Sequence, residues 1–281
     1  MRSVPLRRAA VVLAVVQLAL TVPGAAPVAA AVGNNPISVE IRNDLQCRVD
    51  HVLDWPDTAF YGFDTCATML AVGDTPATSR LFSPGYFGYG SAPGPREGWT
   101  YAALPWSGVG LLNHGVSQVI AGDTGVFVTQ VDSYTQGEER YRTDITLTAG
   151  STAARGVLYR TGQCFFANGT TRVDATTTYP SPMCTKHTGP NPPHIQWIPL
   201  GGPANYAAGS DTDVWAPISA REPFPDTCTC TSGKTAAGLS WSWDLAPGES
   251  VTFSHLTDFG GHRDPVGTWS ASPDTLQPGE T

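Results

Sequence analysis

Apolar and polar residues alternate with a period of two in many short segments of this chain, and Gly, Pro, Asn and Asp separate the segments. This period places every second side chain on one face of a β-strand, whereas the longer period of an α-helix is nearly absent. Many short strands separated by turn residues are typical of a sandwich or a barrel. The sequence therefore predicts an all-β fold, a large antiparallel β-sandwich.

The segment from Gly125 to Thr148 has the clearest pattern, because two alternating runs flank a Gln-Gly-Glu-Glu turn at 136–139. It predicts a β-hairpin whose register puts two sets of side chains on opposite faces. The apolar face holds Val126, Val128, Asp132, Tyr134, Tyr141, Ile145 and Leu147, and the other face holds Val131, Arg140, Arg142 and Asp144. Asp132 would then lie on the core side, where a carboxylate is costly unless it is hydrogen-bonded or ion-paired.

Three further strands follow from the same alternation: a first strand at 37–41, one at 239–245 and one at 251–259. Pro247 and Gly248 turn the chain between the last two, so the final strand should either cross to the facing sheet or return through a bulged loop. Two long irregular stretches remain, at 75–101 and 179–194. The first is rich in aromatic residues, and we expect it to cover the sheet or form a binding rim.

The N-terminus has the order of a secretory signal peptide: early arginines, an uncharged apolar run at 9–22, and small residues near position 30. The apolar run is short of the roughly 20 residues that a membrane-spanning helix needs. We therefore expect a signal peptide at 1–31, a single sandwich domain at 32–260 and a poorly ordered Pro- and Gly-rich tail at 261–281. These boundaries predict secretion to the extracellular space without membrane insertion.

Six cysteines follow the predicted signal peptide: Cys47, Cys66, Cys164, Cys184, Cys228 and Cys230. An even count behind an export signal predicts disulfides, whose pairing the sequence leaves open. Pairing the first two and the middle two would close loops of about 20 residues, each worth roughly 3 kcal/mol. The last two would then close only a tiny, strained Cys-Thr-Cys ring. No metal or cofactor is predicted, because the spaced Cys-x-x-Cys pairs of zinc sites are absent.

Five segments carry a resemblance to a known kind of domain: Cys-Arg-Val-Asp-His at 47–51, Ala-Gly-Asp-Thr-Gly at 121–125, Glu-Glu-Arg-Tyr-Arg-Thr-Asp at 138–144, Leu-Tyr-Arg-Thr-Gly-Gln-Cys at 158–164 and Leu-Ala-Pro-Gly-Glu-Ser-Val-Thr-Phe-Ser-His at 245–255. Together they resemble an uncharacterised domain of secreted actinobacterial proteins, over nearly the whole chain after the first 31 residues. The resemblance implies a β-sandwich of the galactose-mutarotase-like, or supersandwich, type. It implies no activity and no catalytic residue.

The chain has a formal charge of −8, and loss of three arginines with the signal peptide would make it more acidic. Nucleic acids and anionic membranes are therefore disfavoured as partners.

Local motifs of serine hydrolases, zinc proteases and nucleotide-binding loops are missing from the sequence. Sugar-acting sandwiches spread their carboxylates and histidines over several strands, where local motifs do not show them. The candidate catalytic residues are therefore Asp132, His51 and His255. A structural histidine is the favoured alternative for the last two, and a buried ion pair with an arginine is favoured for Asp132.

Trp99, Trp106 and Trp197 lie beside irregular segments and are candidates for an exposed aromatic platform that stacks on sugar rings, with core packing as the alternative. Asp211 and Asp213 could contribute to a calcium site, although two carboxylates alone are weak evidence.

These features favour a secreted, non-catalytic module that binds glycan, such as a polysaccharide, or another cell-surface ligand. The alternative is a carbohydrate-active enzyme, a hydrolase, lyase or epimerase, with the three candidate catalytic residues in one cleft. A purely structural or partner-binding surface protein is the third hypothesis.

Overall fold

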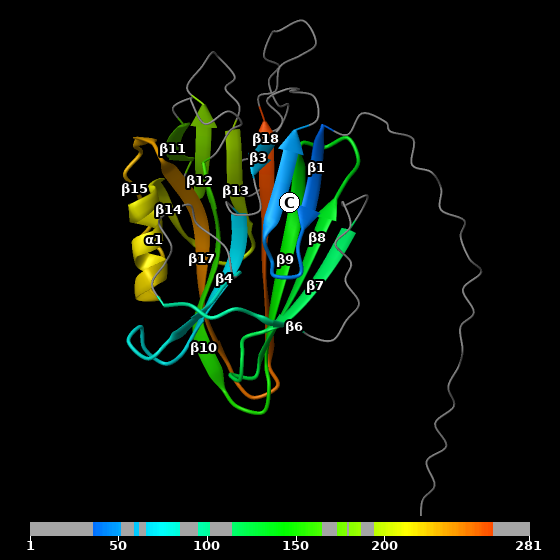
Figure 1. Ribbon diagram of the computed structural model, residues 1–281, viewed down its shortest axis with the longest axis vertical. Coiled ribbons are helices and arrows are strands. Elements are labelled where there is room, and N and C mark those ends of the chain that lie inside the picture. Colours follow the sequence, from blue (N-terminus) through cyan, green and yellow to red (C-terminus); the bar gives the residue numbers. More distant parts are fainter. Residues whose placement is uncertain are drawn as a thin grey trace, which may run out of the picture. The chain divides into compact units, whose positions relative to one another are not determined.

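The computed structural model in Figure 1 describes residues 36–51, 59–61, 66–84, 95–101, 114–164, 173–178, 180–186 and 194–260. The predicted signal peptide, the predicted tail, Trp106 and much of both irregular stretches lie outside these residues. The described residues form strands and one α-helix, and the sheets pack together, so the predicted sandwich-like all-β fold is confirmed.

Within the described residues, the largest sheet has nine strands. Its order is β16 (Ser232–Gly233), β11 (Val173–Thr178), β12 (Ser181–Lys186), β13 (His194–Leu200), β18 (Ser250–Gly260), β9 (Arg140–Ala149), β8 (Val126–Tyr134), β7 (His114–Ile120) and β6 (Thr100–Tyr101). The register shows that neighbours throughout this sheet run antiparallel, as predicted.

The same described ranges form a second sheet of six strands and a third of three. The six-stranded order is β15 (Thr227–Cys228), β14 (Asn205–Ser210), β17 (Thr235–Leu245), β10 (Ala154–Gln163), β4 (Cys66–Val72) and β5 (Arg80–Phe82). The three-stranded sheet consists of β1 (Ile37–Ile41), β2 (Cys47–His51) and β3 (Ala59–Tyr61). An isolated bridge from Gln46 to Ala67 connects the start of β2 to β4, so the small sheet adjoins the six-stranded one.

Two hydrophobic clusters separate the layers. The main cluster joins inward residues of all three sheets, among them Val49, Leu70, Leu147 and Trp241. A second cluster lies on the opposite face of the six-stranded sheet, where Met69 and other residues pack against the α-helix α1 (Asp211–Ala220). Strand β4 is consequently buried along its whole length. The six-stranded sheet is thus a middle layer between α1 and the nine-stranded sheet.

The predicted hairpin forms with the predicted register. Val126 to Tyr134 pairs with Arg140 to Ala149, and Tyr134 lies opposite Tyr141. Burial alternates along both strands, with the predicted apolar set inside the sandwich and the predicted polar set on the outer face. The first strand shows the same alternation over Ile37–Ile41. Period-two patterning therefore predicted both the strands and the faces that they bury.

The last two strands cross between sheets, which confirms the first of the two predicted alternatives. Strand β17 belongs to the six-stranded sheet, and β18, after a turn at 246–249, belongs to the nine-stranded sheet. Both are interior strands: β17 pairs with β14 and β10, and β18 pairs with β13 and β9.

Helix α1 was not predicted. Ser210 is its N-cap: the Ser210 hydroxyl accepts a hydrogen bond from the Asp213 N–H at 3.2 Å, and the Asp213 carboxylate accepts one from the Ser210 N–H at 3.1 Å. This reciprocal pair of hydrogen bonds is a capping box. The acidic residues of the first turn, Asp211 and Asp213, stabilise the helix further, because they lie at the positive end of its dipole. Asp211 and Asp213 therefore begin a helix. Within the described residues, no group of three or more His, Cys, Asp or Glu side chains could hold a metal ion.

Three disulfides form. Cys47 pairs with Cys66 and Cys164 with Cys184, as the loop lengths suggested, and Cys228 pairs with Cys230. The first two bridges are buried, whereas Cys228 is half-buried and Cys230 exposed. In the ranges that the structure describes, no helix is long and apolar enough to cross a membrane.

Candidate functional site

Asp132 lies on the inward face of β8 and is 1% exposed. Its carboxylate accepts hydrogen bonds from the Thr143 hydroxyl at 2.7 Å and from Gln130 Nε2 at 2.8 Å. Burial raises the pKa of Asp132 above its ordinary value, while the charge of Arg160 and the two hydrogen bonds act in the opposite direction. The prediction of a hydrogen-bonded carboxylate on the core side is confirmed.

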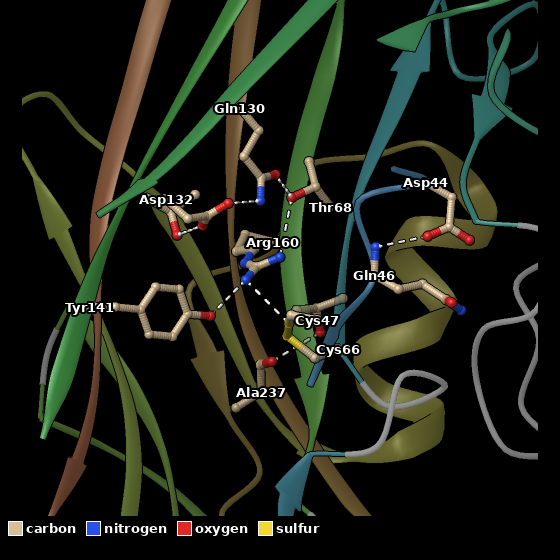
Figure 2. The surroundings of a disulfide bond; sticks show 12 residues. Asp44, Gln46, Cys47, Cys66, Thr68, Gln130, Asp132, Tyr141, Arg160 and Ala237 are labelled. Carbon is tan, nitrogen blue, oxygen red and sulfur yellow. Dashed lines mark hydrogen bonds between the residues drawn. A yellow bond between two sulfur atoms is a disulfide. The ribbon is translucent and has the colours of Figure 1, made fainter. Parts of the chain in front are cut away.

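Arg160 enters the same region from β10, on the facing sheet, and is fully buried (Figure 2). Its Nη2 donates to the Tyr141 hydroxyl at 2.9 Å and contacts Cys47 Sγ at 3.2 Å, and its Nη1 donates to Thr68 Oγ1 at 3.3 Å. The guanidinium thus connects the two large sheets to the Cys47–Cys66 disulfide. Because a buried cation needs several polar partners, this arrangement compensates part of its lost hydration.

A short relay joins Arg160 to Asp132. The Thr68 hydroxyl accepts from Arg160 and donates to Gln130 Oε1 at 2.6 Å, and Gln130 Nε2 then donates to Asp132. Figure 2 shows these side chains between the sheets. The arginine expected beside Asp132 is present, but among the ion pairs of the described residues none joins the two directly. The hypothesis of a direct ion pair is therefore corrected to a hydrogen-bonded relay.

His255 lies on the inward face of β18, opposite Thr143 in the register, and is fully buried. Its ring is 6.1 Å from the Trp241 ring, and neither ring nitrogen has a hydrogen-bond partner in the part of the chain that the structure describes. Burial lowers the pKa of His255 well below its ordinary value, and the charge of Arg160 lowers it further. His255 is therefore held neutral inside the sandwich.

Two of the three candidate catalytic residues, Asp132 and His255, do not form an accessible site. Asp132 and His255 flank Thr143 on the inner face of the nine-stranded sheet, so the topology brings them near each other, but both are closed off from solvent. His51 ends strand β2 opposite Ile37, and its side chain lies outside the described part of the chain. A dissolved substrate cannot reach Asp132 or His255 in this structure.

For Trp99 and Trp197, core packing is confirmed and the alternative of an exposed platform is wrong. Trp99 is 7% exposed, and its ring stacks on that of Phe82 with a distance of 6.1 Å between the ring centroids. Trp197 is fully buried on the inward face of β13. Their position beside irregular segments suggested exposure, but Trp197 points to the inward face of its strand and Trp99, just before β6, packs into the main hydrophobic cluster. Trp106 lies outside the described residues. Trp99 and Trp197 therefore pack in the core and are not available for stacking on a ligand.

The outer face of the nine-stranded sheet carries hydroxyl side chains in adjacent rows, which we call the hydroxyl face: Thr129, Thr146, Thr148, Ser250, Thr252 and Ser254. The register aligns Thr129, Thr146 and Thr252 across β8, β9 and β18. The hydroxyls of Thr146 and Thr252 are hydrogen-bonded at 2.8 Å, as are those of Thr148 and Ser250. This face is half-buried to exposed along its length.

Phe127 flanks the hydroxyl face. It lies opposite Thr148 on the outer face and is 44% exposed, a high fraction for an aromatic side chain. Val116, on the neighbouring strand β7, is also exposed.

Arg142 and Asp144 form an ion pair on this outer face, with Arg142 Nη2 2.8 Å from Asp144 Oδ1. Partial burial opposes ionisation of Asp144, but hydrogen bonds from Arg142 and Ser254 outweigh it and lower the pKa of the carboxyl. The hydroxyl face is thus bordered by the exposed Phe127 side chain and by a charge pair.

Sequence reasoning placed Arg142 and Asp144 on this outer face but did not identify the hydroxyls as a site. A signal was available, because Thr-Leu-Thr at 146–148 and Ser-Val-Thr-Phe-Ser at 250–254 put a hydroxyl at every second position. No protein-family model matches the chain, and no curated protein matches it.

Proposed function

We propose that this protein is a secreted, non-catalytic module that binds a neutral polysaccharide on the hydroxyl face. The observation that carries the proposal is the alignment of side-chain hydroxyls across β8, β9 and β18, with Phe127 exposed at their border. The burial of Asp132 and His255 weighs against the enzyme alternative, because an acid or base must reach the bond that it acts on.

Hydroxyl side chains suit sugar ligands because each is both a donor and an acceptor, as a sugar hydroxyl is. In the Thr146–Thr252 pair, one hydrogen bond uses one donor and one acceptor, so an O–H and several lone pairs remain for a ligand. Neighbouring strands are about 4.8 Å apart, and every second residue along a strand faces the same side. The hydroxyls therefore form a regular surface that can contact successive sugar units.

Phe127 supplies the apolar contact that sugar recognition also requires. The apolar face of a pyranose ring packs on an aromatic ring, and such contacts supply affinity beyond that of hydrogen bonds exchanged with water. Phe127 follows Val126 on β8, and its ring is held on the outer face by the inward packing of its neighbours. It replaces Trp99 and Trp197, which are buried, as the aromatic candidate.

Charge favours a neutral glycan. Arg142 is paired with Asp144, and Arg140 lies 3.2 Å from Glu138, so these outward arginines are already neutralised. The chain as a whole has a formal charge of −8. An acidic protein whose outward cations are paired repels polyanionic sugars and nucleic acids.

The disulfides support the secreted part of the proposal. Three bridges join all six cysteines, and disulfides form and persist in oxidising compartments outside the cytoplasm. The signal-peptide pattern of residues 1–31 points to the same route.

Affinity electrophoresis and calorimetry with soluble neutral polysaccharides, such as glucans, mannans and xylans, test the proposal. Phe127→Ala should weaken binding about tenfold, which corresponds to about 1.4 kcal/mol of lost contact. Thr146→Val and Thr252→Val each remove a hydroxyl at nearly constant shape and should weaken binding about fivefold. A polyanionic sugar such as pectin should bind no better than the neutral ones.

Thr227→Val is the matched control, because Thr227 is an exposed strand threonine on β15, in the other large sheet. It should leave binding unchanged. Equal weakening by Thr227→Val, or no binding to any neutral polysaccharide, would overturn the proposal.

A further inference from the structure

The Cys228–Cys230 disulfide differs from the other two in its surroundings. The four cysteines of the other bridges are at most 5% exposed and belong to the core between the sheets, whereas Cys230 is exposed and Cys228 half-buried. Solvent-borne thiolates can therefore reach only this bridge without unfolding the core. Access is the first requirement of thiol–disulfide exchange.

Of the three bridges, Cys228–Cys230 also contributes least to the stability of the fold. Loop-closure stabilisation grows with the number of residues enclosed, and this bridge spans a sequence separation of 2, against 19 and 20 for the others. Cys230 in addition has φ +45°, the left-handed region that residues other than glycine rarely adopt. Opening the ring therefore costs little and frees Cys230 from a disfavoured conformation.

Other contacts hold the segment in place when the bridge opens. The Thr229 N–H donates to the Ala208 carbonyl at 2.9 Å, and the Thr229 hydroxyl donates to Asp213 at 2.8 Å. The segment lies between two short edge strands, β15 of the six-stranded sheet and β16 of the nine-stranded sheet. The two thiols would thus remain neighbours, so the bond can open and close repeatedly.

We propose that Cys228–Cys230 is an exchangeable disulfide that oxidises a dithiol of a partner peptide or protein. A substrate thiolate attacks Cys230 Sγ, the bond between the two sulfurs breaks, and Cys228 leaves as a thiolate. The second substrate thiolate then attacks the substrate sulfur of the mixed disulfide and releases Cys230 as a thiolate. The substrate loses two electrons and becomes a disulfide, and the two cysteines gain them and take up the two protons.

The first experiment uses the oxidised wild-type chain in native buffers of graded glutathione ratio, followed by alkylation and peptide mapping. We expect Cys228 and Cys230 to become labelled at a ratio of reduced to oxidised glutathione at least about tenfold lower than the four core cysteines. Labelling of all six together, or of the core cysteines first, overturns the proposal. This measurement needs no variant, so misfolding cannot obscure it.

The second experiment mixes the oxidised chain, without oxygen, with a reduced two-cysteine peptide. Up to one equivalent of peptide disulfide should form per chain, and the variant Cys228→Ala/Cys230→Ala should form none. Equal oxidation by that variant, or none by the wild type, contradicts the proposal.

Single variants identify the attacked sulfur. The free Cys230 thiol of Cys228→Ser should form a mixed disulfide with oxidised glutathione faster than the free Cys228 thiol of Cys230→Ser, because Cys230 is the more exposed. The reverse order would contradict attack at Cys230. The proposal is independent of the hydroxyl face, so polysaccharide binding should be the same in the wild type and in the double alanine variant.

Discussion

The guanidinium of Arg160 and the carboxylate of Asp132 are joined through two intervening side chains. Every hydrogen bond of the relay points from the cation to the anion: Arg160 donates to Thr68, which donates to Gln130, which donates to Asp132. The two charges come from opposite sheets, so the relay crosses the sandwich core. Two buried charges in such a relay are strongly coupled, because a low-dielectric interior screens them weakly.

Changing both members of the relay should cost less than the sum of the two single changes. Asp132→Asn replaces the acceptor of the Thr143 and Gln130 hydrogen bonds by an amide and should lower the free energy of unfolding by about 1–3 kcal/mol. Arg160→Met should cost less in acid than at neutral pH, because Asp132 can then take up a proton and become neutral. In urea denaturation, the double variant should be more stable than the sum of the single losses predicts, by about 1–3 kcal/mol.

Arg142 and Asp144 provide the matched double-mutant cycle on the outer face, since they are the same residue types with an exposed arginine and a partly buried aspartate. Their coupling should be at most about 1 kcal/mol. If the stability losses of the Asp132 and Arg160 single variants simply add in the double variant, the relay does not couple these two residues.

His255 predicts a loss of stability in acid. The pKa of this group is lower in the folded state than in the unfolded state, so below the unfolded value of about 6.5 the unfolded chain binds a proton that the folded chain does not. Stability from this group is therefore present at neutral pH and is lost as the pH falls. Between pH 7 and pH 5, the wild type should lose about 2 kcal/mol relative to His255→Leu.

Asp132 changes stability with pH in the opposite direction from His255. The pKa of Asp132 is raised in the folded state, so its contribution to the free energy of unfolding is lost as the pH rises. It is present in both proteins, so the difference between them isolates His255. A difference in unfolding free energy that stays constant with pH would mean that His255 does not titrate on unfolding.

The disulfides should differ in their effect on stability. Replacing Cys47 and Cys66 by alanine should cost about 3 kcal/mol from loop closure, and more because Arg160 loses its contact with Cys47 Sγ. Replacing Cys228 and Cys230 should cost less than about 2 kcal/mol. Thermal unfolding followed by circular dichroism measures both, and equal losses would contradict the loop-length argument.

The capping box of α1 gives a prediction for the middle layer. Ser210→Ala removes the acceptor of the Asp213 N–H and should lower the free energy of unfolding by about 1 kcal/mol. Thr212→Ala, at an exposed position in the same helix, should change it by no more than about 0.5 kcal/mol. Chemical denaturation compares the two, and similar losses would mean that the cap contributes nothing specific.

Strand alternation predicted the parts of the fold that a period of two determines. The inward set of β8 and β9 includes Asp132, and its burial followed from register alone, because a residue two positions from a buried one shares its face. The sheet to which each strand belongs could not be predicted in the same way. Pairing between β10 and β17 joins residues far apart in the sequence, and no local pattern encodes it.

Helix α1 was missed for a physical reason. It spans only 10 residues, contains Pro217 and buries only part of one side, so it shows little of the periodicity that identifies longer helices. The spacing of Ser210 and Asp213 was nevertheless a capping-box signal. Arg160 was also missed as a core residue, because arginine is seldom fully buried and only its partners on other strands make burial tolerable.

The strands that complete both large sheets, β17 and β18, come last among the described strands. Until residues 235–260 have paired, β14 and β10 have no strand between them, and the same holds for β13 and β9. During synthesis the earlier segments would therefore carry unpaired strand edges, which are prone to aggregation. The sandwich can close only after residues 235–260 have left the ribosome, so a chain with this topology stays open while nearly all of its other described strands are being made.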